Sequence, residues 1–196
     1  MRRKVIGILL IILILLTFVA CSSQPNMVTV AELTEREELI LSTTTDQYFV
    51  YDFYSEDKGS KELSIWMEKY EAGKQVGEKQ NHTSAQVNQE GTIMITMQDH
   101  KETQQKSTHL VIQDQSGTSM VSFNDTIAEI EFAASLSGNL QDELQINDEE
   151  VVLGYVAYTM ASSISGLTLD FYGDPQSNMK ELEKYDLVYL IKAQFQ

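Results

Sequence analysis

Apolar residues occupy alternate positions in the stretch QYFVYDFY, which spans residues 47–54. Phe49, Tyr51 and Phe53 fall on one side of an extended chain, and the residues between them fall on the other. This period of two is typical of a β-strand that buries one face. The same alternation returns in other segments, which include residues 63–67, 93–97, 110–112, 130–136 and 187–195.

The spacing of these segments predicts a mainly β domain. About nine or ten short strands separated by polar turns indicate an antiparallel β-sandwich or an open barrel. One short α-helix is predicted near the C-terminus, at about residues 174–185. Asp174 is a good N-cap for this helix, and Pro175 suits its first position.

Two neighbouring alternating segments are predicted to pair. Residues 49–53 and 63–67 are separated by turn-forming residues that include Asp57 and Gly59. Two short strands joined by such a turn usually form a β-hairpin. We therefore expect these segments to lie side by side in one sheet.

A short helix is predicted before the first of these segments. Thr34 and Glu37 have the spacing of a capping box, which favours a helix that runs through Leu41. The β-branched residues of 43–45 oppose its continuation. An edge strand is the alternative for the same segment.

A short internal similarity is also present. Residues 52–54 and residues 170–172 both read Asp-Phe-Tyr, and each triplet is followed by a Lys-Glu-Leu sequence. A duplicated unit would explain the match, and so would chance. The likeness ends after about a dozen residues, which is short for a structural repeat.

The N-terminus has the organisation of an export signal. Arg2, Arg3 and Lys4 precede an apolar run that begins at Val5, and the segment ends in Thr-Phe-Val-Ala-Cys. Small residues followed by Cys21 resemble the lipobox of bacterial lipoproteins. The resemblance implies that the signal is cut before Cys21 and that the Cys21 thiol carries a diacylglyceryl group.

These features divide the chain into three parts. Residues 1–20 form the signal peptide, residues 21–31 contain the lipidated cysteine and a tether, and residues 32–196 form a single mainly β extracytoplasmic domain. An uncleaved membrane helix is the alternative for the apolar run. Both alternatives place the domain on the outer side of the cell membrane. The rest of the chain resembles small surface lipoproteins of Gram-positive bacteria.

Charge excludes several classes of partner. The chain has 14 Lys and Arg residues against 29 Asp and Glu residues, a net charge of −15, and removal of the three cations of residues 1–20 leaves 11 against 29, or −18. An anionic backbone would be repelled, so no nucleic acid is expected to bind. The sequence lacks a glycine-rich phosphate loop, so no nucleotide is expected. Its single cysteine excludes an internal disulfide or a cysteine-based zinc cluster.

Four aromatic residues form a candidate binding face. Trp66 and Tyr70 share one side of a predicted strand, and Tyr48 and Tyr54 would join them from a neighbouring strand. An exposed aromatic row of this kind can seat a partner protein or stack on a sugar. The alternative is that both faces of the strand that carries Trp66 are packed.

Acidic residues and histidines give only weak candidates for ion binding. His82, His100 and His109 lie in or beside polar stretches, and no two of them have metal-site spacing. The acidic turn at residues 148–150 is a weak candidate for calcium, which prefers oxygen ligands. Its members are Asp148, Glu149 and Glu150. A solvated turn is the alternative.

One catalytic pattern is present but incomplete. Ser177 and Lys180 match SxxK, in which a lysine amine accepts the serine proton. The SxN-type and KTG-type elements that accompany it in penicillin-binding proteins are missing. A capped surface helix is therefore the better interpretation of this segment.

The sequence predicts a membrane-anchored lipoprotein that serves as a non-catalytic binding or accessory module. Its expected partners are the membrane, through the lipid, and a protein or an envelope ligand. No cofactor is expected apart from the covalent diacylglycerol at Cys21. The alternative is a small cell-envelope hydrolase with an unrecognised site.

Overall fold

The computed structural model describes residues 26–55, 61–77, 81–100, 102–126, 132–140, 143–146 and 148–196. The predicted signal peptide and Cys21 lie outside these residues. The elements follow one another in the order β1 (Met27–Val30), α2 (Glu35–Thr44), β2 (Gln47–Tyr54), β3 (Lys61–Glu71), β4 (Lys74–Val76), β5 (His82–Val87), β6 (Glu90–His100), β7 (Gln105–Asp114), β8 (Gly117–Thr126), β9 (Ala134–Asn139), β10 (Leu144–Gln145), β11 (Val151–Thr159), α3 (Leu169–Gly173), α4 (Pro175–Asn178), the 3₁₀ helix η1 (Met179–Lys184) and β12 (Leu187–Phe195).

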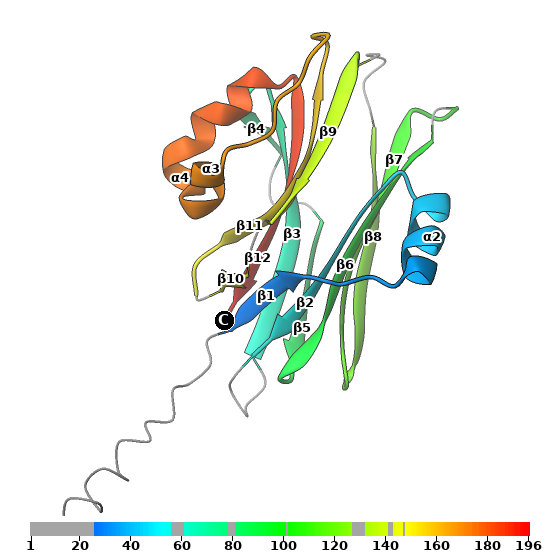
Figure 1. Ribbon diagram of the computed structural model, residues 1–196, viewed down its shortest axis with the longest axis vertical. Coiled ribbons are helices and arrows are strands. Elements are labelled where there is room, and N and C mark those ends of the chain that lie inside the picture. The colour runs from blue at the N-terminus through cyan, green and yellow to red at the C-terminus, as the bar shows by residue number, and fades with distance from the viewer. Residues whose placement is uncertain are drawn as a thin grey trace, which may run out of the picture.

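The strands form two antiparallel sheets that pack face to face (Figure 1). Sheet 1 has the order β10-β1-β2-β6-β7-β8, and sheet 2 has the order β4-β3-β12-β11-β9, with β5 also paired to β3. The prediction of a mainly β sandwich with a short C-terminal helix is confirmed. Asp174 caps that helix as expected, but most of it is 3₁₀ rather than α.

The core lies between the inner faces of the two sheets. Phe49, Tyr51 and Phe53 of β2 are all buried there, as their alternation predicted. Phe53 contacts Phe195 of β12 edge to face, with 6.0 Å between the ring centroids. Burying a large apolar side chain stabilises a fold by about 1.5–3 kcal/mol, so these residues hold the two sheets together.

The predicted hairpin between residues 49–53 and 63–67 is wrong. β2 pairs with β1 and β6 in sheet 1, whereas β3 pairs with β12, β4 and β5 in sheet 2. The two segments therefore lie in opposite sheets instead of sharing hydrogen bonds. Tyr51 of β2 reaches β11 across the core, where its hydroxyl donates to the Leu153 carbonyl at 2.9 Å. Each segment has an apolar face to bury, and the core between the two sheets buries both.

Helix α2 confirms the predicted capping box. Thr34 accepts a hydrogen bond from the Glu37 backbone N–H, and the Glu37 carboxylate accepts one from the Thr34 backbone N–H at 2.8 Å. The helix continues past Leu41 to Thr44, further than predicted. The hydroxyls of Thr43 and Thr44 donate to backbone carbonyls four residues earlier, each at 2.7 Å, so these residues fit the last turn.

The domain begins earlier than the predicted boundary at residue 32. Met27–Val30, which we assigned to the tether, form strand β1 and pair with both β2 and β10. Val28 is fully buried in the core. The predicted tether therefore shortens to the residues before Met27.

Candidate functional site

The outer face of sheet 2 is covered by the helices of residues 169–184 (Figure 1). We call α3, α4 and η1 together the helical cap. Phe171 and Leu182 of the cap are fully buried against outward-facing residues of sheet 2. These sheet residues include Tyr70, Val152, Tyr155, Val188 and Leu190. The cap therefore closes this face.

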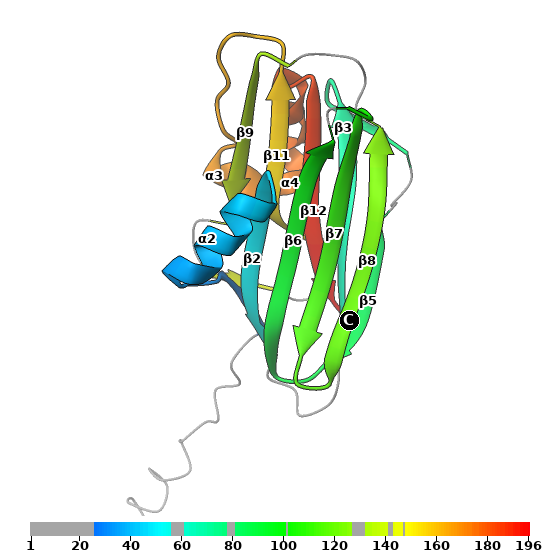
Figure 2. The same ribbon diagram turned by 90° about the vertical axis from the view of Figure 1, so that its right-hand side faces the viewer.

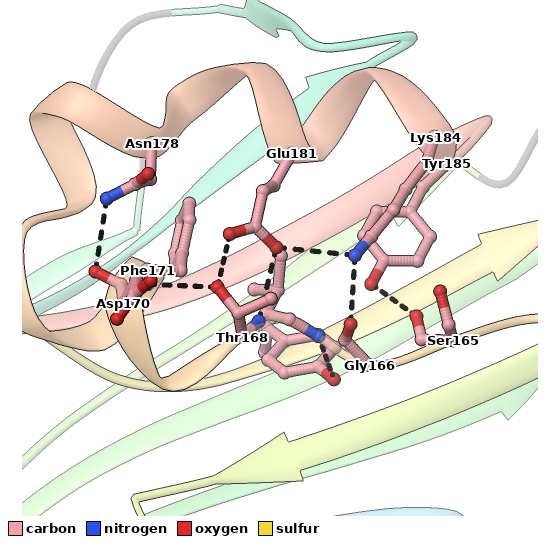
Figure 3. Close-up of polar contacts among 11 residues, drawn as sticks. Ser165, Gly166, Thr168, Asp170, Phe171, Asn178, Glu181, Lys184 and Tyr185 are labelled. Atoms are coloured by element: carbon pink, nitrogen blue, oxygen red, sulfur yellow. Dashed lines mark hydrogen bonds and ion pairs between the residues drawn. The ribbon is translucent and has the colours of Figure 1, made fainter.

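Polar contacts hold the cap in place (Figure 3). The Glu181 carboxylate accepts hydrogen bonds from the backbone N–H and the hydroxyl of Thr168, and Lys184 Nζ lies 3.3 Å from it. Lys184 also donates to the Gly166 carbonyl at 2.9 Å, and the Tyr185 hydroxyl donates to the Ser165 carbonyl at 2.6 Å. Desolvation alone would raise the pKa of Glu181, but these donors hold that pKa below its usual value. The cap is thus a fixed part of the domain.

A buried ionic cluster lies on the same outer face of sheet 2. The Glu68 carboxylate accepts hydrogen bonds from Trp66 Nε1 at 3.1 Å and from the Tyr70 hydroxyl at 2.7 Å, and Lys192 Nζ lies 2.9 Å from it. All four side chains are buried. Desolvation alone would raise the pKa of Glu68, but the donors together lower it. These partners satisfy a charge that would otherwise destabilise the fold.

The predicted aromatic binding face is therefore not one exposed row. Trp66 and Tyr70 are 1% and 4% exposed, so they cannot meet a partner directly. Tyr48 and Tyr54 belong to β2 in the other sheet, where Tyr48 is half-buried and Tyr54 is exposed. The alternative that both faces of β3 are packed is the correct one. Trp66 and Tyr70 of β3 instead donate hydrogen bonds to the buried Glu68 carboxylate.

A second buried cation lies inside the sandwich. Lys106 of β7 is 1% exposed and forms an ion pair with Asp99 and a hydrogen bond of 2.8 Å with the Tyr158 hydroxyl. Desolvation opposes its charge, but Tyr158 and Asp99 raise the pKa of Lys106 above its usual value. Lys106 therefore joins the two sheets as a charged core residue.

The outer face of sheet 1 differs from that of sheet 2, because no helix covers β6, β7 and β8 (Figure 2). We call the outward side chains of β2, β6, β7 and β8 the open face. Counted from the first residue of each range, they are the residues at every second position of 48–54, 90–100, 105–113 and 118–126. None of them is Lys or Arg, and the only acids among them are Asp52 and Glu90, which are close to each other at one end.

Hydrogen bonds between strands order the polar side chains of the open face. His100 Nε2 lies 2.9 Å from the Ser107 hydroxyl, which in turn donates to Asn124 Oδ1 at 2.7 Å. His109 Nδ1 lies 2.7 Å from the Ser122 hydroxyl. Side chains that are already ordered lose less entropy when a partner binds. This surface is therefore suited to recognition.

Helix α2 stands beside the open face, on the β2 side (Figure 2). None of its residues is buried, and Leu39 and Ile40 are 62% and 51% exposed. Met120 of β8 is also exposed, by 63%. Helices of globular domains normally bury an apolar stripe, whereas α2 leaves its apolar residues Leu39 and Ile40 exposed beside the open face.

An open cavity of about 420 Å³ lies at the end of the open face nearest the start of β1. Tyr54 and the two acids of that face line it, together with Met27 and Thr29. Two of the four aromatic residues singled out in the sequence, Tyr48 and Tyr54, thus belong to the open face.

The other sequence candidates do not come together in one site. His82 is exposed on β5, while Ser177 and Lys180 are exposed on the cap, where α4 gives way to η1. Among the described residues, no group of three or more His, Cys, Asp and Glu side chains converges as metal ligands would.

The acidic turn has a structural partner. Glu150 lies 3.5 Å from Lys192 Nζ, and the Asp148 carbonyl accepts a hydrogen bond of 2.6 Å from Gln194. Asp148 and Glu149 are exposed to solvent. Calcium binding by this turn stays a prediction.

Sequence reasoning missed the open face and both buried cations. The signal for the open face was the absence of charge at alternate positions of residues 105–126. No local signal marks Lys106 or Lys192, because a lysine is usually exposed and its burial depends on distant partners.

Comparison with known proteins identifies a family. The family model described as the YgaN domain matches residues 27–195, from the start of β1 to the end of β12. No curated protein and no solved structure matches the chain. Within the described part of the chain, no helix has the length and apolar character needed to cross a membrane.

Proposed function

The chain belongs to the YgaN domain family, and we propose that it is a lipid-anchored protein on the outer side of the cell membrane. There it acts as a binding or accessory module, without chemistry of its own, for a protein or an envelope ligand. The observation that carries this proposal is the open face: an uncovered sheet surface almost free of charge in a chain with a net charge of −15.

The N-terminal sequence supports the anchor. Arg2, Arg3 and Lys4 precede the apolar run, and Cys21 follows small residues in the manner of a lipobox. Two acyl chains are enough for stable membrane attachment. Met27 is only six positions after Cys21, so the chain between them spans about 20 Å at most. The end of the domain where β1 begins is therefore held close to the bilayer.

The composition of the open face supports binding. The cores of protein interfaces are depleted in charged residues, whereas the free surface of a soluble domain usually carries many. Apart from Asp52 and Glu90 at one end, the open face has no acid, and it carries Ser, Thr, Asn, Gln and His with Met and Val among them. Exposed Leu39 and Ile40 extend the apolar area along its margin.

Site-specific photocrosslinking in intact cells tests the binding role. A photoreactive residue at Gln98, which is exposed on the open face, is compared with one at Leu169, which is 68% exposed on the cap. We expect a discrete adduct from position 98 and none from position 169. Equal adducts from both positions, or no adduct from position 98, would contradict the proposal.

The anchor is tested separately by intact-mass analysis and membrane fractionation. The wild-type chain should lose residues 1–20, gain a diacylglyceryl group and sediment with membranes, whereas the Cys21→Ala variant should do none of these. An unmodified Cys21 at the end of an intact N-terminal segment would refute the lipid anchor and leave the binding role to be judged on the crosslinks alone.

A further inference from the structure

Strand β8 is a long sheet edge. It is ten residues long and contains no Lys, Arg or Pro. It pairs with β7 from Gly117 to Thr126 without a register shift, and no described strand pairs with its other side. The remaining edge strands are shorter: β10 has two residues, β4 has three, and β5 and β9 have six each.

Natural proteins usually shorten, charge, bulge or cover their sheet edges, because an open edge pairs with other strands. In the described part of the chain, β8 has only two of these features: the acid Asp125, and a contact with β5 in which the Ser119 hydroxyl donates to the Ser84 carbonyl at 3.1 Å. In an antiparallel sheet, alternate residues of an edge strand direct their N–H and C=O groups away from the sheet. The outer side of β8 therefore offers roughly five such residues for pairing.

Two cavities lie beside β8 on its core-facing side. The lower one, near the Gly117 end of β8 and of about 190 Å³, lies between Ser119 and strand β5, where Ala85 and Val87 line it. The upper one, of about 80 Å³, is lined by Phe123, Asp125 and residues of β3 and β12. Between them β8 touches β5, because the hydroxyls of Ser119 and Thr83 lie 2.8 Å apart.

The spacing of the cavities matches a β-strand. Ser119 and Asp125, core-facing residues of β8 that line the lower and the upper cavity, are six positions apart, about 20 Å along a strand. Six is an even number, so two side chains with this spacing on an added strand point to the same face. A strand paired to β8 would thus present one side chain to each cavity.

We propose that β8 accepts an extended segment of another protein by strand addition. In this mode of recognition, main-chain hydrogen bonds supply affinity, and pockets for alternate side chains supply specificity. The inference rests on the proposed binding role of the domain and names the place and the form of the partner.

The linings of the cavities define the chemistry of that segment. The lower cavity is lined by the apolar residues Ala85, Val87 and Ile112 and by polar residues that include Asp114. Its apolar part fits a small aliphatic side chain. The upper cavity holds the Asp125 carboxylate, which accepts from the Tyr189 hydroxyl at 2.6 Å and pairs with Lys69 at 2.9 Å. A neutral polar or basic side chain fits there.

Electrostatic repulsion disfavours a second copy of the chain as the strand that pairs with β8. Two copies would each bring a net charge of −15, whereas a neutral or basic segment is not repelled. The occupant of β8 is therefore an extended, neutral or basic strand of a different protein.

Photocrosslinking with the full chain in intact cells tests the proposal. A photoreactive residue at Thr118 reports on the edge, and one at Gln98 reports on the open face away from the edge. Two variants are combined with each: Ala85→Phe, which fills the lower cavity from β5, and Met120→Lys, which adds to the edge the charge that natural edges carry. Leu169→Ala, at an exposed position of the cap away from the open face and from β8, is the control.

We expect Ala85→Phe and Met120→Lys each to reduce the adduct from position 118 about tenfold, and Leu169→Ala to change it less than twofold. If neither Ala85→Phe nor Met120→Lys reduces the adduct from position 98, strand addition at β8 is overturned, but the proposed binding role of the domain is not. An adduct of twice the mass of the chain would show a second copy at β8 and overturn the choice of partner. No adduct from either position would overturn both proposals. Circular dichroism of each purified variant verifies that it folds.

Discussion

Replacing Lys192 with Met removes the cation beside the buried Glu68 carboxylate. The two charged groups lie 2.9 Å apart, and their side chains are 7% and 4% exposed. Removing one partner of a buried ion pair costs about 3–5 kcal/mol, because the other charge stays buried without compensation. Trp66 and Tyr70 keep their hydrogen bonds to Glu68, so we expect a loss near the lower limit, about 3 kcal/mol at pH 7.

The pH dependence of this loss follows from the pKa of Glu68. In the folded chain that pKa is lower than its ordinary value of 4.5. A carboxyl group with a lowered pKa contributes its full stabilisation above its ordinary pKa and loses it as the pH falls. Lys192→Met removes part of the cause of the lowering. The difference in the free energy of unfolding between wild type and variant should therefore be largest near neutral pH and shrink below about pH 4.5.

Urea unfolding followed by tryptophan fluorescence measures this directly, because Trp66 is the only tryptophan and contacts Glu68. Lys69→Met is the matched control. Lys69 lies 2.9 Å from Asp125, but these side chains are 22% and 29% exposed, so we expect a loss of about 1 kcal/mol or less. A loss below about 1 kcal/mol for Lys192→Met at pH 7, or a loss that does not shrink in acid, would refute the reasoning.

Three further substitutions have defined outcomes. Thr34→Ala removes the cap of α2 and should cost about 1 kcal/mol of local helix stability. Amide hydrogen exchange in residues 35–44 should therefore accelerate about fivefold. The urea midpoint should stay constant, because α2 buries no side chain. Leu182→Ala leaves a cavity under the cap and should lower the free energy of unfolding by about 2–5 kcal/mol. Proteolysis between residues 160 and 185 should become faster. An unchanged urea midpoint would contradict the described packing of the cap. Phe195→Ala removes the edge-to-face contact with Phe53 and should cost about 3–5 kcal/mol in the same unfolding assay.

Local sequence signals predicted local structure well. The alternation of Phe49, Tyr51 and Phe53 identified a strand and its buried face, and the Thr34–Glu37 spacing identified the start of α2. These predictions succeed because a side chain's direction in a strand and the capping of a helix depend on residues within a few positions. The fold class follows from the number of such strands.

Long-range pairing was beyond these signals. Alternation shows that β2 and β3 each bury a face, but it does not say which strands they join. The order of strands depends on partners such as β12, which lies more than a hundred residues after β3. The hairpin prediction failed for this reason.

Tertiary context also determines which secondary structure two identical short sequences adopt. The Asp-Phe-Tyr triplet lies in strand β2 at residues 52–54 and in helix α3 at residues 170–172. Phe53 packs in the core between the sheets, whereas Phe171 packs beneath the cap. The same residues adopt the structure that buries their aromatic ring in each place. The structure therefore gives no support for a duplicated unit.

The candidate site shows the same limit. Glu68 falls between Trp66 and Tyr70, so its charge made that side of the strand look solvent-exposed in the sequence. Its partner Lys192 lies 124 positions away, and only their pairing buries the whole row. The open face was equally hidden, because a surface without charge becomes visible only when four strands are placed side by side.

Oxidation of two methionines tests the central claim, that a partner covers the open face in the cell. Met120 on that face is 63% exposed, and Met160, which follows β11 of sheet 2, is 57% exposed, so both should react similarly in the purified full chain. The extent of sulfoxide formation at each is measured by mass spectrometry after brief oxidant treatment of intact cells and of purified protein. We expect Met120 to be protected severalfold in cells and Met160 not to be protected. Equal oxidation of Met120 in cells and in the purified chain would contradict it.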